Sequence, residues 1–207
     1  MKKGGVGVRF QLNKTKFCFV TAHLAAHQNK VQQRNQNFED LLENLIFDNT
    51  VESISVEKHD LVFFYGDLNY RINLSYEECL ELIKEKEFEK LSTFDQLTIE
   101  KDKGNNSLSY FEEGKLNFYP SYKFDLNSSD YDSTEKKRVP SYCDRIIWMN
   151  NQKEEIELKQ EMYTSLMEYE ISDHKPIVSV FNLKIKLFDP KKYEKMKLEL
   201  IKQQQQK

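Results

Sequence analysis

A carboxylate and an amide follow a run of five apolar residues in the first half of the chain. Residues 61–65 have the pattern of a strand buried on both faces, and Gly66, Asp67 and Asn69 come after it. Because Asp67 and Asn69 are two positions apart, their side chains project the same way if the chain stays extended. In that arrangement they can hold a metal-bound water and a phosphate oxygen. An Asx turn, which these residue types also favour, is the alternative.

Three further clusters contain residue types that bind anions or transfer protons. A histidine at a strand end can donate to an anion, and an acidic residue that leads into an apolar strand must be paired if it is buried. Each cluster alone is also typical of ordinary structural residues. The clusters are His23 and His27, the second expected only to cap or pack at a helix start; Asp144 with Arg145; and Asp173 with His174, shortly before Pro176.

The composition indicates one globular, cytosolic domain. The chain has 207 residues, of which 39% are hydrophobic and 31% charged, and its three cysteines have no paired spacing. An odd number of scattered cysteines indicates a reducing compartment rather than a disulfide framework or a structural zinc site. The net charge of −3 excludes attraction of the whole molecule to nucleic acid or to an anionic membrane. An anionic ligand must therefore be bound by a local group of basic residues.

Hydrophobic periodicity predicts an order of strands and helices. The predicted strands cover residues 6–11, 17–21, 61–65, 142–149, 161–169 and 177–187, and the first two form a hairpin. The predicted helices cover residues 28–47, 75–86 and 88–97, and the second opens with a capping box between Ser75 and Glu78. Residues 1–188 form the domain, and residues 189–207 form a charged tail that ends in glutamines and is helical or disordered. A strand that starts at residue 6 leaves an edge bare unless something covers it.

In this order the clusters resemble the catalytic domain of the inositol polyphosphate 5-phosphatases. The matching stretches are HLAAH (23–27), GDLNYR (66–71), YPSYKFD (119–125), RVPSYCDRIIW (138–148) and SDHKP (172–176). GDLN and SDH indicate only the DNase I/exonuclease III-like superfamily of magnesium-dependent phosphoesterases, whereas YPSYK and RVPSYCDRIIW are specific for 5-phosphatases. The similarity runs from Lys3 to about Leu183. It implies an α+β fold, the DNase I-like four-layer αββα sandwich, of which this chain supplies the later, C-terminal part.

The resemblance also implies an activity, the Mg²⁺-dependent hydrolysis of the 5-phosphate of phosphoinositide lipids or soluble inositol polyphosphates. Asp67 is similar to the carboxylate that orients or deprotonates the attacking water, and Asn69 to a donor to the scissile phosphate. His174 is similar to the histidine that stabilises the transition state, and Asp144 to the aspartate that orients it. The other correspondences are His23, a second phosphate-binding histidine; Asp173, near the metal; and Tyr122, Lys123, Lys136 and Arg138, which bind the phosphate beside the scissile one.

The family domain has a first portion that no residue of this chain matches. That portion supplies a glutamate, the principal Mg²⁺ ligand, and an asparagine beside it. We therefore expect these 207 residues to bind Mg²⁺ weakly, and their activity by themselves is left open by the sequence. A fragmentary gene model, a truncated protein and half of an enzyme completed by another chain are open as explanations, and we favour the first.

Two other functions remain open from the sequence. A non-catalytic phosphoinositide-binding module would keep Lys123, Lys136 and Arg138 and would need no metal. A Mg²⁺-dependent endonuclease of the same superfamily would share GDLN and SDH, but it would need a basic surface toward DNA and gives no reason for PSYK and RVPSYCDR. We expect no nucleic-acid partner, a cytoplasmic location and peripheral contact with membranes.

Overall fold

The central element is a four-stranded sheet with the strand order β1-β2-β5-β6. The computed structural model describes residues 4–48, 53–185, 187 and 189–205, so Lys3, where the family similarity was expected to begin, lies outside the described residues. The predicted hairpin is confirmed as β1 (Gly4–Leu12) and β2 (Thr15–His23). β2 runs parallel to β5 (Leu61–Asp67), and β6 (Asp144–Asn150) runs antiparallel to β5 on its other side.

β5 is buried on both faces, as its apolar run predicts. Val62 and Phe64 pack on one side of the sheet with Phe38 and Phe111, while Leu61 and Phe63 belong to a separate cluster on the other side. This division follows from the alternation of side chains along a strand. β5 therefore joins the two halves of the core.

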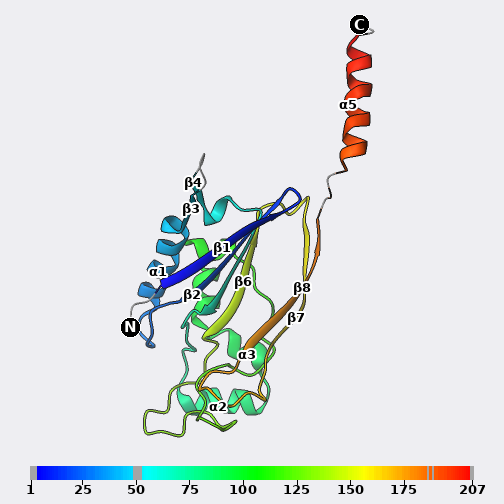
Figure 1. Ribbon diagram of the computed structural model, residues 1–207. Coiled ribbons are helices and arrows are strands. Elements are labelled where there is room, and N and C mark those ends of the chain that lie inside the picture. Colours follow the sequence, from blue (N-terminus) through cyan, green and yellow to red (C-terminus); the bar gives the residue numbers. More distant parts are fainter. Residues whose placement is uncertain (1–3, 49–52, 186, 188, 206–207) are drawn as a thin grey trace.

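Helix α1 (Val31–Asn44) covers one face of the sheet (Figure 1). The predicted helix over residues 28–47 was too long at both ends. At its start, Lys30 N–H closes a turn on His27 O, and at its end residues 46–48 leave the helix to form β3 (Ile46–Asp48), which pairs with β4 (Ser53–Ser55). An apolar pair such as Ile46 and Phe47 satisfies either periodicity, so only the tertiary pairing decides.

The other face packs against a hairpin of β7 (Glu157–Ser165) and β8 (Ile177–Lys184) (Figure 1). Phe181 of β8 meets the rings of Phe63 and Trp148 edge to face, with centroids 5.1 Å away in both cases. The described residues thus stack as helix, sheet and second sheet. The strand predicted over residues 161–169 begins and ends four residues earlier in the structure, because residues 166–169 continue into a turn.

The segment between β5 and β6 contains α2 (Tyr76–Lys84), α3 (Phe88–Ser92), α4 (Gln96–Asp102) and a 3₁₀ turn at Ser107–Tyr110. Another 3₁₀ turn, at Val56–Lys58, precedes β5. The capping box of α2 is confirmed: Ser75 Oγ accepts from Glu78 N–H, and Glu78 accepts from Ser75 N–H. The single helix predicted over residues 88–97 is wrong. Asp95 accepts from Thr98 N–H and starts a separate helix, because an N-cap residue is not itself helical.

Arg145 anchors β6 in the interior through a fully buried ion network. Its guanidinium lies 2.8 Å from Asp95 Oδ1 and 2.7 Å from Glu113 Oε2. Tyr163 of β7 also donates to Glu113, so the network links β6 to α4 and to the second sheet. Asp144 and Arg145 do not pair with each other, because neighbours on a strand point to opposite faces.

Helix α5 (Pro190–Gln205) extends away from the other elements (Figure 1). Asp189 Oδ1 accepts from the N–H groups of Lys191 and Lys192 at its first turn, and Pro190 occupies the first helical position. The predicted charged tail is helical to Gln205, and residues 206–207 lie outside the described chain. Within the described chain, no helix combines the length and apolar character needed to cross a bilayer.

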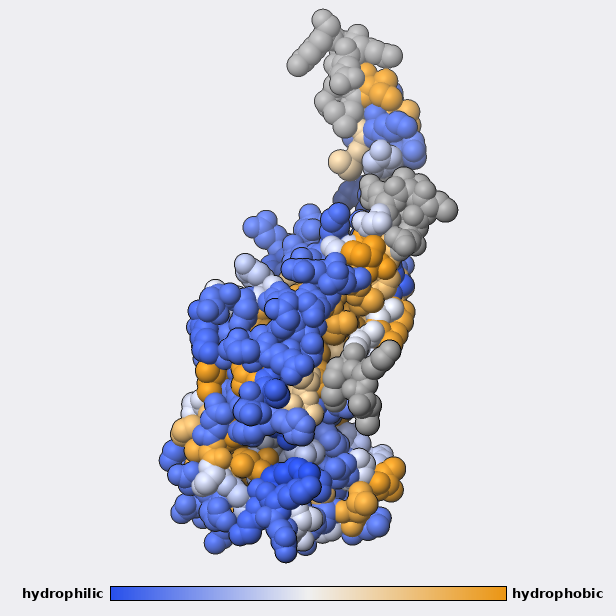
Figure 2. All heavy atoms as spheres, turned by 90° about the vertical axis from the view of Figure 1, so that its left-hand side faces the viewer, coloured by the Kyte–Doolittle hydropathy of each residue, from blue (hydrophilic) through white to orange (hydrophobic). Residues whose placement is uncertain are grey.

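β1 leaves an apolar face open to solvent. Val6, Val8, Phe10 and Leu12 alternate along it and are each between 48% and 65% exposed. Figure 2, viewed over α1, shows a mostly hydrophilic surface with apolar atoms gathered along one side. Within the described residues β1 is the edge of its sheet, so the bare edge expected from the sequence is present.

We expect Phe64→Ala to lower the free energy of unfolding by about 3–5 kcal/mol, because the fully buried ring would leave a cavity. Phe64 contacts Phe38 at 4.6 Å and Phe111 at 6.3 Å between ring centroids. Urea unfolding followed by circular dichroism measures the change. Tyr110→Ala, at a ring that is 69% exposed, is the matched control and should have little effect. A loss below about 1 kcal/mol for Phe64→Ala would contradict its place in the core.

Candidate active site

Three polar side chains lie in one row at one end of the sheet. In the strand registers, His23 at the end of β2 is opposite Asp67 at the end of β5, and Asp67 is opposite Asp144 at the start of β6. His23 Nε2 lies 3.1 Å from Asp67 Oδ2. The row brings together residues that are 44 and 77 positions apart in sequence. It places three of the predicted site residues side by side.

Gly66 is required for this close approach of β5 to β2. Its φ is +124°, and a Cβ there would lie 2.4 Å from Ala22 O. Any other residue would push the two strands apart beside His23 and Asp67. There is therefore a steric reason for glycine at the first position of the matched GDLNYR stretch.

Asn69 does not project beside Asp67 from an extended chain, because the backbone turns. The φ of Asn69 is +60°, and its N–H donates to Asp67 Oδ1 at 3.1 Å, so the Asx-turn alternative is the one the structure shows. Asn69 is buried, and its Nδ2 donates to Leu24 O, while its Oδ1 accepts from Arg71. The turn leaves the Asp67 carboxylate at the strand end beside His23, but the expected side-by-side projection of Asp67 and Asn69 is not formed.

His174 joins the row from a loop that lies far from it in sequence. Its Nδ1 is 2.7 Å from Asp144 Oδ2, and the hydroxyl of buried Ser121 donates to the same oxygen at 2.7 Å. Backbone bonds fix this loop, since Lys175 N–H donates to Ser121 O and Tyr122 bridges to His174. Asp144 thus holds one ring nitrogen of His174 and leaves Nε2 for another partner.

The charges of the row shift two pKa values upward. Burial raises the pKa of the Asp67 carboxyl, and the negative charge of Asp144 raises it further, against the opposing effect of His174 and His23. Burial lowers the pKa of the His174 imidazole. The hydrogen bond to Asp144 and the negative charges of Asp144, Asp67 and Asp173 outweigh this effect, so the pKa is raised. Both upward shifts come from carboxylates gathered around one imidazole in a partly buried site.

A basic hollow of about 460 Å³ opens next to this row. Among the described residues, the charged side chains that line the hollow are all positive. The guanidinium of Arg71 stacks on the Tyr122 ring, 4.4 Å from its centroid. Three of the four predicted substrate-binding residues, Tyr122, Lys136 and Arg138, line it. Its other lining residues are Ala26, His27, Gln28, Arg71, Leu74, Lys137 and Val139.

Asp132 holds two of the predicted phosphate-binding side chains. This buried carboxylate lies 3.6 Å from Lys123 Nζ and 3.5 Å from Arg138 Nη1, and it accepts from Arg138 N–H at 3.0 Å. Lys123, the fourth predicted residue, is therefore directed to Asp132 rather than into the lining of the hollow. Burial raises the pKa of Asp132, but hydrogen bonds from Thr134 and Arg138 and the charge of Lys123 outweigh it and lower the pKa to about 2.

Sequence reasoning missed Ser121, Arg71 and Asp132. Ser121 and Arg71 lie inside the matched YPSYK and GDLNYR stretches, so their position was a usable signal. Asp132 lies in the polar segment 127–135, outside all of the matched stretches. Its role depends on contacts with Lys123 and Arg138 that only the folded chain makes.

No group of three or more histidine, cysteine or acidic side chains is arranged to hold a metal ion among the described residues. Asp173, the predicted metal ligand, lies next to His174 and adds to the negative charge around it. The available donors are separate carboxylates rather than a closed ligand cage.

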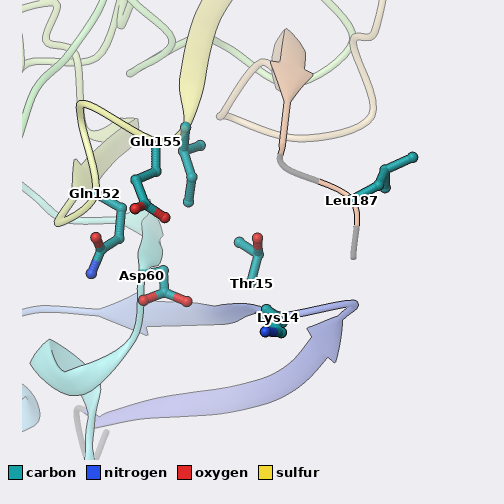
Figure 3. Close-up of a pocket in the computed structure, with 7 residues that line it drawn as sticks. Lys14, Thr15, Asp60, Gln152, Glu155 and Leu187 are labelled. Carbon is teal, nitrogen blue, oxygen red and sulfur yellow. The ribbon is translucent and has the colours of Figure 1, made fainter. Parts of the chain in front are cut away.

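A second hollow lies at the opposite end of the strands and does not have this character (Figure 3). It measures about 380 Å³ and is lined by Lys14, Thr15, Asp60, Gln152, Glu155, Ile156 and Leu187. Asp60 there accepts from Lys16 N–H and caps the strand start. Its charged lining consists of two carboxylates and one lysine, so this hollow has no positive field that would attract phosphate.

Residues 1–180 match the endonuclease/exonuclease/phosphatase family 2. The mouse (Mus musculus) type II inositol 1,4,5-trisphosphate 5-phosphatase is 38% identical over 203 residues, which are 96% of this chain and 20% of that protein. Human (Homo sapiens) synaptojanin-2 is 33% identical over 210 residues, which are 90% of this chain and 14% of that protein. The chain thus spans a fifth or less of the length of these curated relatives.

A solved structure extends the comparison to the fold. The inositol polyphosphate 5-phosphatase domain of SPsynaptojanin, in complex with inositol (1,4)-bisphosphate and a calcium ion, matches with a TM-score of 0.82 and 33% identity, over 99% of this chain and 57% of that chain. The chain belongs to the endonuclease/exonuclease/phosphatase family 2, a family of metal-dependent phosphoesterases, and has the α+β, DNase I-like fold. Within that family, its similarity to the inositol polyphosphate 5-phosphatase catalytic domain is confirmed.

We expect Asp132→Asn to destabilise the protein in a pH-dependent way. A carboxyl whose pKa falls on folding adds stability above its unfolded pKa of about 4, and that stability is lost as the pH falls toward about 2. The difference in melting temperature between wild type and variant should therefore be largest near neutral pH and should disappear as the pH falls through that acid range. Thermal unfolding at several pH values measures it, with Asp130→Asn, at an exposed site, as control. A gap independent of pH would contradict the assignment.

Proposed function

We propose that the chain binds phosphoinositides or inositol polyphosphates in the basic hollow and hydrolyses their 5-phosphate at the row of His23, Asp67 and Asp144. The observation on which this rests is the Ser121–Asp144–His174 hydrogen-bond chain, which directs an imidazole toward the space beside a positively charged hollow. Relatives named as inositol 5-phosphatases, and a solved relative holding inositol (1,4)-bisphosphate, support the choice of substrate class.

Each proposed role follows from a contact of the side chain. Asp67 is the base or orienting group for the attacking water, because it is a strand-end carboxylate whose pKa burial brings closer to neutrality. His174, held through Nδ1, donates from Nε2 to a phosphate oxygen as negative charge develops. His23, which lies 3.1 Å from Asp67, contributes a further donor to the phosphate. Asn69 is buried and bonded to Leu24 O and Arg71, so its role is to hold the turn that follows Asp67.

Mg²⁺ is the proposed metal, and the donors fit the way this ion binds. Mg²⁺ is usually held by one or two carboxylates together with substrate phosphates and waters, rather than by an all-protein cage. Asp173, with Asp67 nearby in the same negative field, would hold it, and the bound ion would neutralise charge on the phosphate. Because fewer than three ligands gather on the described chain, we expect the binding to be weak in this chain by itself.

The neighbouring phosphate of the substrate is assigned to the basic hollow. Arg138 and Lys136 supply charge-assisted donors, and Arg71, stacked on Tyr122, also lines the hollow. Asp132 restrains Arg138 and Lys123 before a ligand arrives, which lowers the entropy cost of binding.

A second candidate function is binding of the same headgroups without turnover. The observation that favours it is a hollow with a positively charged lining beside a site where the described residues gather no group of three or more metal ligands. Headgroup affinity that does not change in Asp67→Asn, with no phosphate release from either protein, would favour this function.

We also propose a cytoplasmic location with peripheral contact with membranes. Cys18, Cys79 and Cys143 are buried and unpaired, and burial raises the pKa of Cys18 and Cys79 to about 12. Such thiols stay protonated and need no oxidising compartment.

We expect His174→Ala to reduce phosphate release from phosphatidylinositol 4,5-bisphosphate with Mg²⁺ by about 10²- to 10⁴-fold, the usual contribution of a positioned acid–base group. Colorimetric phosphate release gives the rates, and calorimetric binding of inositol 1,4-bisphosphate shows that the hollow is intact. Equal rates in both proteins would refute the role of His174. No release from either would refute catalysis by this chain alone and favour the binding function.

Arg138→Ala and Lys136→Ala should each weaken the binding of inositol 1,4-bisphosphate about 10- to 100-fold, because hydrogen bonds between charged groups contribute about 1.5–3 kcal/mol. Isothermal titration calorimetry measures the affinity. Lys84→Ala, at an exposed lysine of α2, is the control for loss of one positive charge. Similar weakening in all three variants would show general attraction rather than a defined subsite.

A further inference from the structure

One wall of the basic hollow, defined here as residues 26–28, has a strained backbone at its centre. Ala26, His27 and Gln28 line the hollow from this wall, and Arg71 lines the same hollow. The φ of His27 is +81°, in the left-handed region that residues with a Cβ rarely adopt. Such a conformation persists only where the surrounding structure holds it. The wall therefore depends on bonds that come from outside it.

Arg34 of α1 supplies bonds to three successive carbonyls of this kind. Its side chain is fully buried, and its Nη1 donates to Ala25 O at 3.0 Å and to His27 O at 2.7 Å. Its Nη2 donates to Gln28 O at 3.4 Å. Burial lowers the pKa of the Arg34 guanidinium to about 10, so the group stays charged at neutral pH and keeps all of its donors. One rigid fork thus holds the backbone on both sides of the strained residue.

Gln96, the first residue of α4, joins the wall to Arg71. Its Oε1 accepts from Arg34 Nη2 at 2.5 Å and from Arg71 N–H at 3.0 Å. Its Nε2 donates to Gln28 O at 3.1 Å and to Asn73 Oδ1 at 2.8 Å. Arg34 and Gln96, named the clamp from here on, therefore fix the wall and Arg71 to one frame.

The clamp lies behind the hollow rather than in it. Arg34 is fully buried and Gln96 is 4% exposed, and neither belongs to the lining residues. Burying a guanidinium among neutral partners costs free energy, and apolar residues of similar volume often replace buried charged groups without loss of stability. Stability of the fold alone therefore does not require this arrangement. Any influence of the clamp on a ligand must pass through the wall and Arg71.

We propose that Arg34 and Gln96 are positioning residues for headgroup binding, which hold the wall and Arg71 in the arrangement that an anionic inositol headgroup meets in the basic hollow. This inference rests on the proposed function, because it needs that ligand in the hollow. A wall that is fixed before binding lowers the entropy cost of association. Loosening the wall weakens affinity even though no group that contacts the ligand has been removed.

The sharpest variant is Gln96→Leu, which removes no charge and no lining side chain. We expect it to weaken the binding of soluble inositol 1,4-bisphosphate about five- to tenfold, measured by isothermal titration calorimetry. Arg34→Met should weaken binding at least as much. Arg34→Lys keeps the charge and can still donate to carbonyls, so it should recover part of that loss.

Asn151→Ala is the matched control for the loss of a structural amide. Asn151 Nδ2 also donates to two backbone carbonyls, those of Glu57 and His59, but it follows the end of β6 that lies opposite the site. We expect its headgroup affinity to equal that of the native chain. Circular dichroism melts of all the proteins show whether a loss of affinity merely follows a loss of stability.

Hydrogen exchange followed by mass spectrometry tests the clamp without any ligand. The amides of residues 26–30 and 71–73 should exchange faster in Gln96→Leu than in the native chain, because their segments lose a common anchor. The amides of β1 and β2 should exchange at unchanged rates. A role in stability alone predicts instead a lower melting temperature with no faster exchange confined to the wall.

The outcomes separate the positioning role from the proposed function. Unchanged headgroup affinity in both Gln96→Leu and Arg34→Met would refute the positioning role, as would equal weakening in Asn151→Ala. Should Arg34→Met fail to fold, Arg34→Lys and Gln96→Leu carry the comparison. Absence of headgroup binding by the native chain would refute the proposed function, and exchange at the wall would then decide whether the clamp holds it.

Discussion

The register of β5 against its two neighbours is the constraint on which the rest of the structure depends. Val62 and Phe64 must face α1, and Leu61 and Phe63 must face the second sheet. A slip of one residue would reverse every side chain of the strand, so the apolar core fixes the pairing. The same pairing brings Asp67 between His23 and Asp144. The site is therefore held in place by residues that take no part in its chemistry.

β6 shows how one strand serves both stability and chemistry. Arg145 turns inward to Asp95 and Glu113, while the preceding Asp144 turns to His174 and Ser121. Breaking a fully buried ion pair is costly, so the start of β6 cannot move without large loss of stability. Asp144 inherits that rigidity, and a rigid carboxylate needs no reorganisation when charge develops next to it.

Local patterns were sufficient where local physics decides, as in the β1–β2 hairpin, the apolar run of β5 and the capping box of α2. They failed where a distant partner decides: β3 leaves the end of α1 to pair with β4, and the left-handed Asn69 follows from bonds to Leu24 and Arg71. Motif resemblance brought forward His23, Asp67, Asp144 and His174 as candidates, and the folded chain places these four side chains together. It did not predict that Ser121 supports Asp144 or that Asp132 restrains Arg138, since each contact joins segments brought together only by folding.

The open face of β1 has a consequence for the behaviour of the protein in solution. Among the described residues the outer edge of β1 is unpaired and its four apolar side chains are half exposed, so the strand offers both hydrogen-bonding groups and apolar area to another extended segment. A net charge of −3 gives only weak repulsion between copies, and added salt screens that repulsion. Self-association through this edge should therefore increase with ionic strength, opposite to the salt dependence expected of the proposed headgroup binding in the basic hollow.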